Sequence, residues 1–175
     1  MLEQSRVVRK LTKDEITDLI SEIKLDPKWV KHYDGVTALQ DGTTLYLQQF
    51  NQEATKLIFS NFKKYPKTHA IIKNIAGDAP LGRCYWHKLM PGDKINRHDD
   101  SDQLHVINGS LANRYQIYLK GDDNFLLEMD NAVKSSKDLE FSVVDFALTN
   151  THFYQNNSNQ PWVFLVFDVL HKSKS

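Results

Sequence analysis

The hydrophobic pattern of the chain changes its period near Leu81. Before that point, apolar residues recur every three or four positions in two segments, 13–24 and 52–64, which predicts two amphipathic helices. After it, apolar and polar residues alternate in short runs separated by Gly, Asn, Asp and Lys, which predicts strands. Helices followed by many short strands indicate an antiparallel β-sandwich or barrel with helices packed against one face.

Capping and turn residues set the expected boundaries of these elements. Thr12 and Glu15 have the spacing of a capping box, so the first helix is expected to begin after Thr12. Asn51 is a candidate cap for the second helix, and Pro66 is expected to end it. Strands are expected at residues 43–50, 81–89, 114–119, 124–129, 141–146 and 162–170.

Length and composition favour a single domain over residues 1–175, with a mostly helical support segment over 1–80 and a β core over 81–171. The 22 Lys and Arg balance the 22 Asp and Glu, so nothing in the charge argues for nucleic-acid or membrane-surface binding. Cys84 is the single cysteine, which excludes an intrachain disulfide and favours a reducing compartment. With no apolar run long enough for a signal peptide or a membrane span, we expect a cytoplasmic protein.

A stretch that begins with a Pro-Gly turn carries the most informative side chains. Residues 89–100 read LMPGDKINRHDD, and alternation along an extended chain places His98 and Asp100 on one side and Asp99 on the other. His152 follows just before the last apolar strand. A surface His-Asp pair would have the same spacing, but two histidines and one carboxylate also form the ligand set of non-haem Fe(II) oxygenases.

Motifs in the C-terminal half resemble those of the aspartyl/asparaginyl β-hydroxylase-like oxygenases. Residues 89–98 are similar to the family segment L-x-P-G-x-x-I-x-x-H, and residues 114–119 resemble its R-x-H-x-x-L strand. Residues 152–171 resemble the last hairpin, which closes on D-V-x-H. The resemblance spans 81–171 and implies a double-stranded β-helix, a jelly roll of cupin type, with the N-terminal helices packed on it. It also implies that Fe(II) and 2-oxoglutarate are the cofactors.

The same resemblance assigns roles to individual residues. His98 and His152 match the two histidine ligands of the family, and Asp100 stands where a carboxylate completes the metal site. The positions that match 2-oxoglutarate contacts are Arg114, Gln116, where the family often has histidine, and His87, where members have a serine.

One position departs from the family pattern. Ten residues after the second histidine, the family has an arginine that clamps the far carboxylate of 2-oxoglutarate, and this chain has Trp162. An indole offers one neutral donor and no charge, so it cannot form the bidentate pair that arginine makes with a carboxylate. The candidates for the missing charge are Arg83, Arg114 and Lys120.

These features predict an Fe(II)- and 2-oxoglutarate-dependent dioxygenase that uses O2 to hydroxylate a protein side chain or a small amino-acid-like molecule. One alternative is a catalytically degenerate jelly-roll domain that binds a metal or a partner without turnover. Trp162 favours that alternative, and the intact set of three ligands disfavours it. Another is a cupin-type metal-dependent isomerase or hydrolase, which would need a further ligand, and only His105 offers itself.

Overall fold

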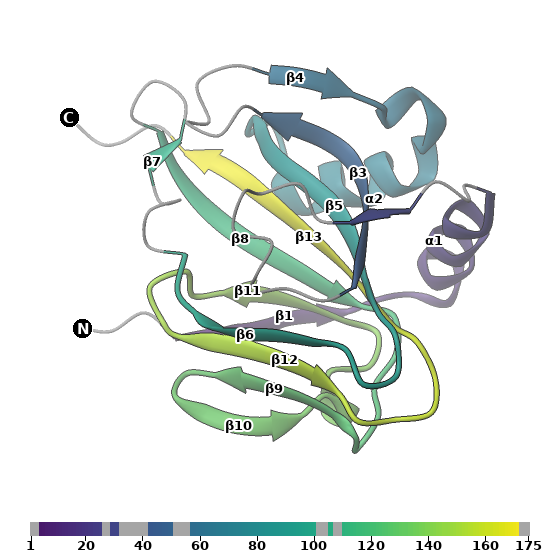
Figure 1. Ribbon diagram of the computed structural model, residues 1–175. Helices are drawn as coiled ribbons and strands as arrows, with labels where there is room; N and C mark the ends of the chain where they lie inside the picture. Colours follow the sequence, from purple (N-terminus) through teal and green to yellow (C-terminus); the bar gives the residue numbers. More distant parts are fainter. Residues whose placement is uncertain are drawn as a thin grey trace.

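Two antiparallel sheets form the body of the protein in the computed structural model (Figure 1). The structure describes residues 4–25, 29–31, 42–50, 57–100, 105–106 and 110–171. The nine-stranded sheet has the order β1 (Arg6–Lys10), β11 (Ser142–Phe146), β8 (Ser110–Tyr118), β13 (Trp162–His171), β5 (Leu81–Leu89), β3 (Thr43–Phe50) and β2 (Val30–Lys31). Two further strands join it at the side, β4 (Leu57–Ser60) on β3 and β7 (His105–Val106) on β8. The four-stranded sheet has the order β10 (Ala132–Ser135), β9 (Phe125–Met129), β12 (His152–Asn156) and β6 (Lys94–His98).

The chain passes back and forth between the two sheets from β5 onward. β5, β8, β11 and β13 lie in the large sheet, whereas β6, β9, β10 and β12 lie in the small one. Every strand pairing among them is antiparallel. This path is that of a double-stranded β-helix, so the predicted fold class is confirmed.

Two buried clusters hold the layers together. One lies between the sheets and combines Tyr118 and Phe164 of the large sheet with Leu127 and Tyr154 of the small one. The other lies between the large sheet and the helices α1 (Lys13–Leu25) and α2 (Pro66–Ala76), which Figure 1 shows together at one end of the molecule. Because both faces of the large sheet are covered, its central strand β13 is buried almost throughout, as a continuous apolar run predicts.

The first predicted helix is confirmed, with Thr12 and Glu15 exchanging the two hydrogen bonds of a capping box at 3.2 and 2.9 Å. The second, over 52–64, is wrong where the structure describes it. Residues 57–60 form β4, residues 62–64 form a short 3₁₀ helix, and residues 51–56 lie outside the described part. Pairing with β3 supplies backbone hydrogen bonds that the local helical pattern did not anticipate.

Pro66 begins a helix and does not end one. It occupies the first turn of α2, where a missing N–H costs nothing because that donor has no partner within the helix. The segment before Leu81 contains strands as well as helices among its described residues. It contributes β1, β3 and β4 to the large sheet, because partners far along the chain, β11 and β5, provide the ladders.

The strands that the sequence pattern missed are short or lie at a sheet edge. β1 and β10 are edge strands with exposed side chains, so they lack the buried alternating face that marks a strand in sequence. β6 and β12 were recognised only as segments near the two histidines. In the described part of the chain, neither α-helix has the length and apolar character needed to cross a bilayer.

Replacing Glu22 by alanine is expected to destabilise the fold by about 2 kcal/mol. The Glu22 carboxylate is buried and accepts hydrogen bonds from the backbone N–H groups of Lys67 and Thr68, both at 2.8 Å, so it caps the start of α2. Asp18→Ala is the matched control, because Asp18 pairs with the exposed Nζ of Lys67 and its loss should change stability far less than the loss of Glu22. Urea unfolding would measure both, and equal losses would contradict the capping role of Glu22.

Candidate metal centre

Two paired strands of the small sheet bring the two histidines together. His98 is the last residue of β6 and His152 is the first of β12, and the antiparallel register places them directly opposite each other. Their ring centroids are 4.3 Å apart. Asp100 follows β6, and its backbone N–H donates to the carbonyl of Leu148 at 3.1 Å, which holds the chain as it turns back toward the rings.

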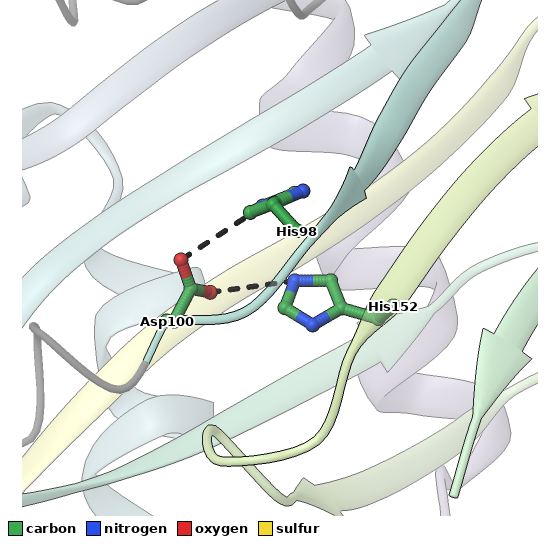
Figure 2. A group of neighbouring side chains, drawn as sticks. All are labelled: His98, Asp100 and His152. Atoms are coloured by element: carbon green, nitrogen blue, oxygen red, sulfur yellow. Dashed lines mark ion pairs between the residues drawn. The ribbon is translucent and has the colours of Figure 1, made fainter. Parts of the chain in front are cut away.

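The three predicted ligands converge on one point (Figure 2). One donor atom from each of His98, Asp100 and His152 lies within 4.8 Å of the others. Nε2 of His98 is 3.8 Å from Oδ1 of Asp100, and Nε2 of His152 is 3.4 Å from Oδ2 of Asp100. All three residues line the same cleft. This arrangement places two nitrogens and one oxygen on one side of a space that an ion could occupy.

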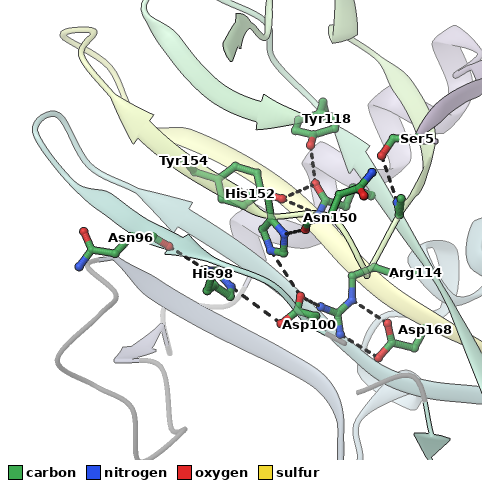
Figure 3. Close-up of polar contacts among 12 residues, drawn as sticks. Ser5, Asn96, His98, Asp100, Arg114, Tyr118, Asn150, His152, Tyr154 and Asp168 are labelled. Atoms are coloured by element: carbon green, nitrogen blue, oxygen red, sulfur yellow. Dashed lines mark hydrogen bonds and ion pairs between the residues drawn. The ribbon is translucent and has the colours of Figure 1, made fainter. Parts of the chain in front are cut away.

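Backbone carbonyls define which nitrogen of each ring is available. Nδ1 of His98 lies 2.7 Å from the carbonyl oxygen of Asn96, and Nδ1 of His152 lies 3.1 Å from that of Asn150 (Figure 3). Because a carbonyl can only accept, each Nδ1 carries a hydrogen, so Nε2 is the nitrogen of each ring that could bind an ion. Burial, reinforced by His152, lowers the pKa of His98, so the ring is neutral as metal binding requires.

A buried arginine orders the carboxylate ligand (Figure 3). Nη1 of Arg114 donates to Oδ2 of Asp100, while its Nε and Nη2 donate to the two oxygens of Asp168 at 2.8 and 3.2 Å. Burial by itself would raise the pKa of Asp100, but Arg114, His152 and His98 together outweigh burial, and the pKa lies well below its usual range. Asp100 is therefore ionised and oriented. Two imidazoles and one carboxylate fit Fe(II).

The residues predicted to contact 2-oxoglutarate fall into two groups. Arg114, Gln116, His87 and Arg83 all line the cleft beside the three candidate ligands. The amide of Gln116 donates to the hydroxyl of Tyr154 at 2.7 Å, so its polar atoms belong to a hydrogen-bonded group on the cleft wall.

The other two predicted residues, Lys120 and Trp162, do not line the cleft. β8 ends at Tyr118, so the alternation that would turn Lys120 inward ends before it, and its Nζ instead donates to Oε1 of Gln160. Trp162 is completely buried and stacks on Phe125 with a centroid separation of 5.0 Å. The structure therefore removes Lys120 as a candidate for the missing charge.

Asp168 is a partner of the site that was not predicted from the sequence. It is 2% exposed, and the register of β13 and β8 places it directly opposite Arg114. The sequence contained a signal, because an acid in the middle of a strongly apolar strand requires a buried partner. Which cation meets it depends on the pairing of two strands that are far apart along the chain.

The fold and the site together define a class. A double-stranded β-helix that carries two histidines and an aspartate at the ends of neighbouring strands has the architecture and ligand set of the non-haem iron oxygenases. The sequence profile of the aspartyl/asparaginyl beta-hydroxylase family matches residues 11–172, and the chain belongs to this family. Comparison with curated protein sequences finds no match.

Solved structures share the fold at low sequence identity. An oxidoreductase of the 2OG-Fe(II) oxygenase family from Burkholderia pseudomallei is 12% identical, with a TM-score of 0.61 over 93% of this chain and 82% of that one. A prolyl-4-hydroxylase from Pseudomonas putida is also 12% identical, with a TM-score of 0.58 over 97% and 91%. A prolyl hydroxylase from Trichoplax adhaerens, in complex with a hypoxia inducible factor peptide, is 8% identical, with a TM-score of 0.64 over 95% and 83%.

Proposed function

We propose that this protein is an Fe(II)- and 2-oxoglutarate-dependent dioxygenase that hydroxylates a protein side chain or a small amino-acid-like molecule. The observation that carries the proposal is the convergence of His98, Asp100 and His152 at a cleft, in a chain that belongs to the aspartyl/asparaginyl beta-hydroxylase family. Carbonyl partners engage both Nδ1 atoms and so leave Nε2 of each ring to face the ion, and Arg114 is paired with Asp100.

Each side chain of the site has a definite task in this reaction. Bound Fe(II) and 2-oxoglutarate would supply the activation of O2, with release of succinate and CO2. His98, Asp100 and His152 would hold the ion on one side, so that positions remain for the cosubstrate and O2. Arg114 holds Asp100 in place, as the hydrogen-bonding partners of metal ligands do, and Asp168 in turn orients Arg114.

The lining of the cleft combines polar and apolar side chains. Ile95, Phe164 and Val166 are buried apolar residues that line it, while Gln116 and Tyr154 present hydrogen-bonding groups beside them. A cleft in which many polar and charged groups converge beside a few apolar residues can bind and orient a small polar molecule. The protein's own contribution is therefore to position the reactants and to exclude side reactions.

The substrate class is proposed from the family and supported by the fold neighbours. The Pseudomonas and Trichoplax proteins are prolyl hydroxylases, and the latter binds a peptide. A side chain in a peptide, or a free amino-acid-like molecule, is therefore the proposed substrate here. A balanced charge gives no support for a nucleic-acid partner, and the single buried Cys84 supports a cytoplasmic location.

A second candidate is a degenerate domain that binds a metal or a partner without turnover. The observation that favours it is Trp162, which stands where the resemblance expects the carboxylate clamp and lies in the core. The cupin-type isomerase or hydrolase has less support. Among the described residues the metal-binding group consists of three ligands, and the side chain of His105 lies outside the described part.

Anaerobic titration of the Fe(II) protein with 2-oxoglutarate is expected to produce a metal-to-ligand charge-transfer band. Admission of O2 should then convert 2-oxoglutarate to succinate, even without the substrate, at a slow rate. The Zn(II)-loaded protein is the matched control, because Zn²⁺ has no redox chemistry and should give neither the band nor succinate. Absence of the band at millimolar 2-oxoglutarate, together with absence of succinate, would overturn the dioxygenase proposal in favour of the degenerate domain.

A further inference from the structure

An aromatic cluster closes the interior of the β-helix beyond Gln116. Its members are all buried: Tyr118, Phe125, Tyr154, Trp162 and Phe164. The ring of Trp162 lies 5.0 Å from that of Phe125 and 6.1 Å from that of Tyr118, and Tyr154 lies 5.1 Å from Phe164. A carboxylate placed among these rings would lose its hydration without gaining a cation, which costs several kcal/mol. The end of the cavity near Trp162 is therefore unsuited to an anion.

Two arginines line the cleft in the part of the chain that the structure describes, Arg83 and Arg114. Arg114 donates through Nε and Nη2 to Asp168 and through Nη1 to Asp100, so most of its donors point at carboxylates of the protein itself. Both of these carboxylates are ion-paired to it in a buried setting. Arg114 therefore orients the proposed metal ligand Asp100, and the two carboxylates neutralise its positive charge.

Arg83 lies on the inner face of the cleft at its β5 side. Strand alternation turns Arg83, Tyr85 and His87 to the same face of β5, and all three line the cleft. Gln49 lines it from the adjacent strand β3, and its buried Oε1 makes no hydrogen bond within the described residues. An amide has two donor hydrogens as well as this acceptor, so Gln49 can turn toward an anion bound there.

We propose that Arg83 holds the remote carboxylate of the 2-oxo acid, so that the cosubstrate lies across β5 toward β3 and not along the barrel toward Trp162. This proposal rests on the proposed dioxygenase function, because it concerns the cosubstrate of that reaction. A guanidinium makes two parallel hydrogen bonds with a carboxylate, which compensates for the clamp that Trp162 cannot provide.

The test compares two five-carbon ligands, 2-oxoglutarate and 2-oxopentanoate, which differ only in the remote carboxylate. Binding to the anaerobic Fe(II) protein is measured by calorimetry and by the charge-transfer band. Arg83→Gln is expected to weaken 2-oxoglutarate by about ten- to a hundredfold and to leave 2-oxopentanoate unchanged, because one charge-assisted partner is lost. Arg83→Lys keeps the charge without the bidentate geometry and is expected to give an intermediate loss.

Lys120→Gln is the matched control, since Lys120 lies outside the cleft and its loss should leave both affinities unchanged. Equal weakening of both ligands by Arg83→Gln, or of neither, would overturn the role of Arg83. If one of the two variants does not fold, the other still tests the proposal: full 2-oxoglutarate affinity in the folded variant would overturn the role of Arg83. If the unmodified protein with Fe(II) binds neither ligand, the proposed function itself fails, and this outcome is distinct from the others.

Discussion

Replacing Asp100 by alanine is expected to abolish tight Fe(II) binding. Asp100 supplies the only anionic donor of the His98, Asp100 and His152 group, and its carboxylate is 5% exposed and ionised beside Arg114. Loss of a ligand should exceed the roughly 10- to 100-fold loss of affinity that follows removal of an outer partner. Anaerobic calorimetry with Fe(II) measures the effect.

Asp99→Ala provides the matched control for this experiment. Asp99 is the exposed neighbour of Asp100, and it is not among the residues that line the cleft. The two variants lose the same formal charge, so a general electrostatic effect would weaken Fe(II) binding equally in both. An Asp100→Ala protein that binds Fe(II) as well as Asp99→Ala does would show that the three residues are not the ligand set.

Replacing Arg114 by methionine is expected to cost about 3–5 kcal/mol of stability, because removing one partner of a buried ion pair leaves uncompensated charge. Here the loss strands two carboxylates, Asp100 and Asp168, which are 5% and 2% exposed. For a protein of this length that corresponds to a fall in Tm of roughly 10 °C. Fe(II) affinity should also fall by about 10- to 100-fold, since Asp100 loses the group that orients it.

The double variant Arg114→Met/Asp168→Leu separates charge from packing. Replacing both members of a buried pair by apolar residues is often close to neutral for stability, so the double variant should recover a large part of the loss. Fe(II) affinity should stay low in it, because Asp100 still lacks Arg114. If the losses of stability from the two substitutions simply add, so that the double variant is less stable than Arg114→Met, then Arg114 and Asp168 do not stabilise each other as their geometry implies.

The family resemblance predicts that Arg114 contacts 2-oxoglutarate. In the structure, the guanidinium of Arg114 also makes contacts within the protein. Its donors reach Asp100 and Asp168. The sequence could place Arg114 on the inner face of its strand by parity, but not opposite Asp168. That contact needs the register of β8 against β13, which the chain sets only when the sheet forms.

Local pattern and long-range pairing explain which elements could be predicted. The helix at 13–25 has a capping box and its own apolar stripe, so local residues determine it. Residues 57–60 also have apolar residues at helical spacing, yet they form β4, because β3 offers a ladder that the local sequence does not reveal. Pro66 has the same ambiguity, since proline both starts and ends helices.

By itself, the sequence determined the fold class and the group of three candidate ligands. Alternation after Leu81 and the H-x-D spacing with a later histidine are local patterns, and the β-helix brings His98 beside His152 because their strands pair. Only the tertiary structure decided which cations face the cleft. β8 ends before Lys120, Asp168 meets Arg114, and Trp162 joins an aromatic cluster, so Arg83 is the remaining candidate. These outcomes depend on strand ends, register and packing between residues that are distant along the chain, and no local pattern encodes them.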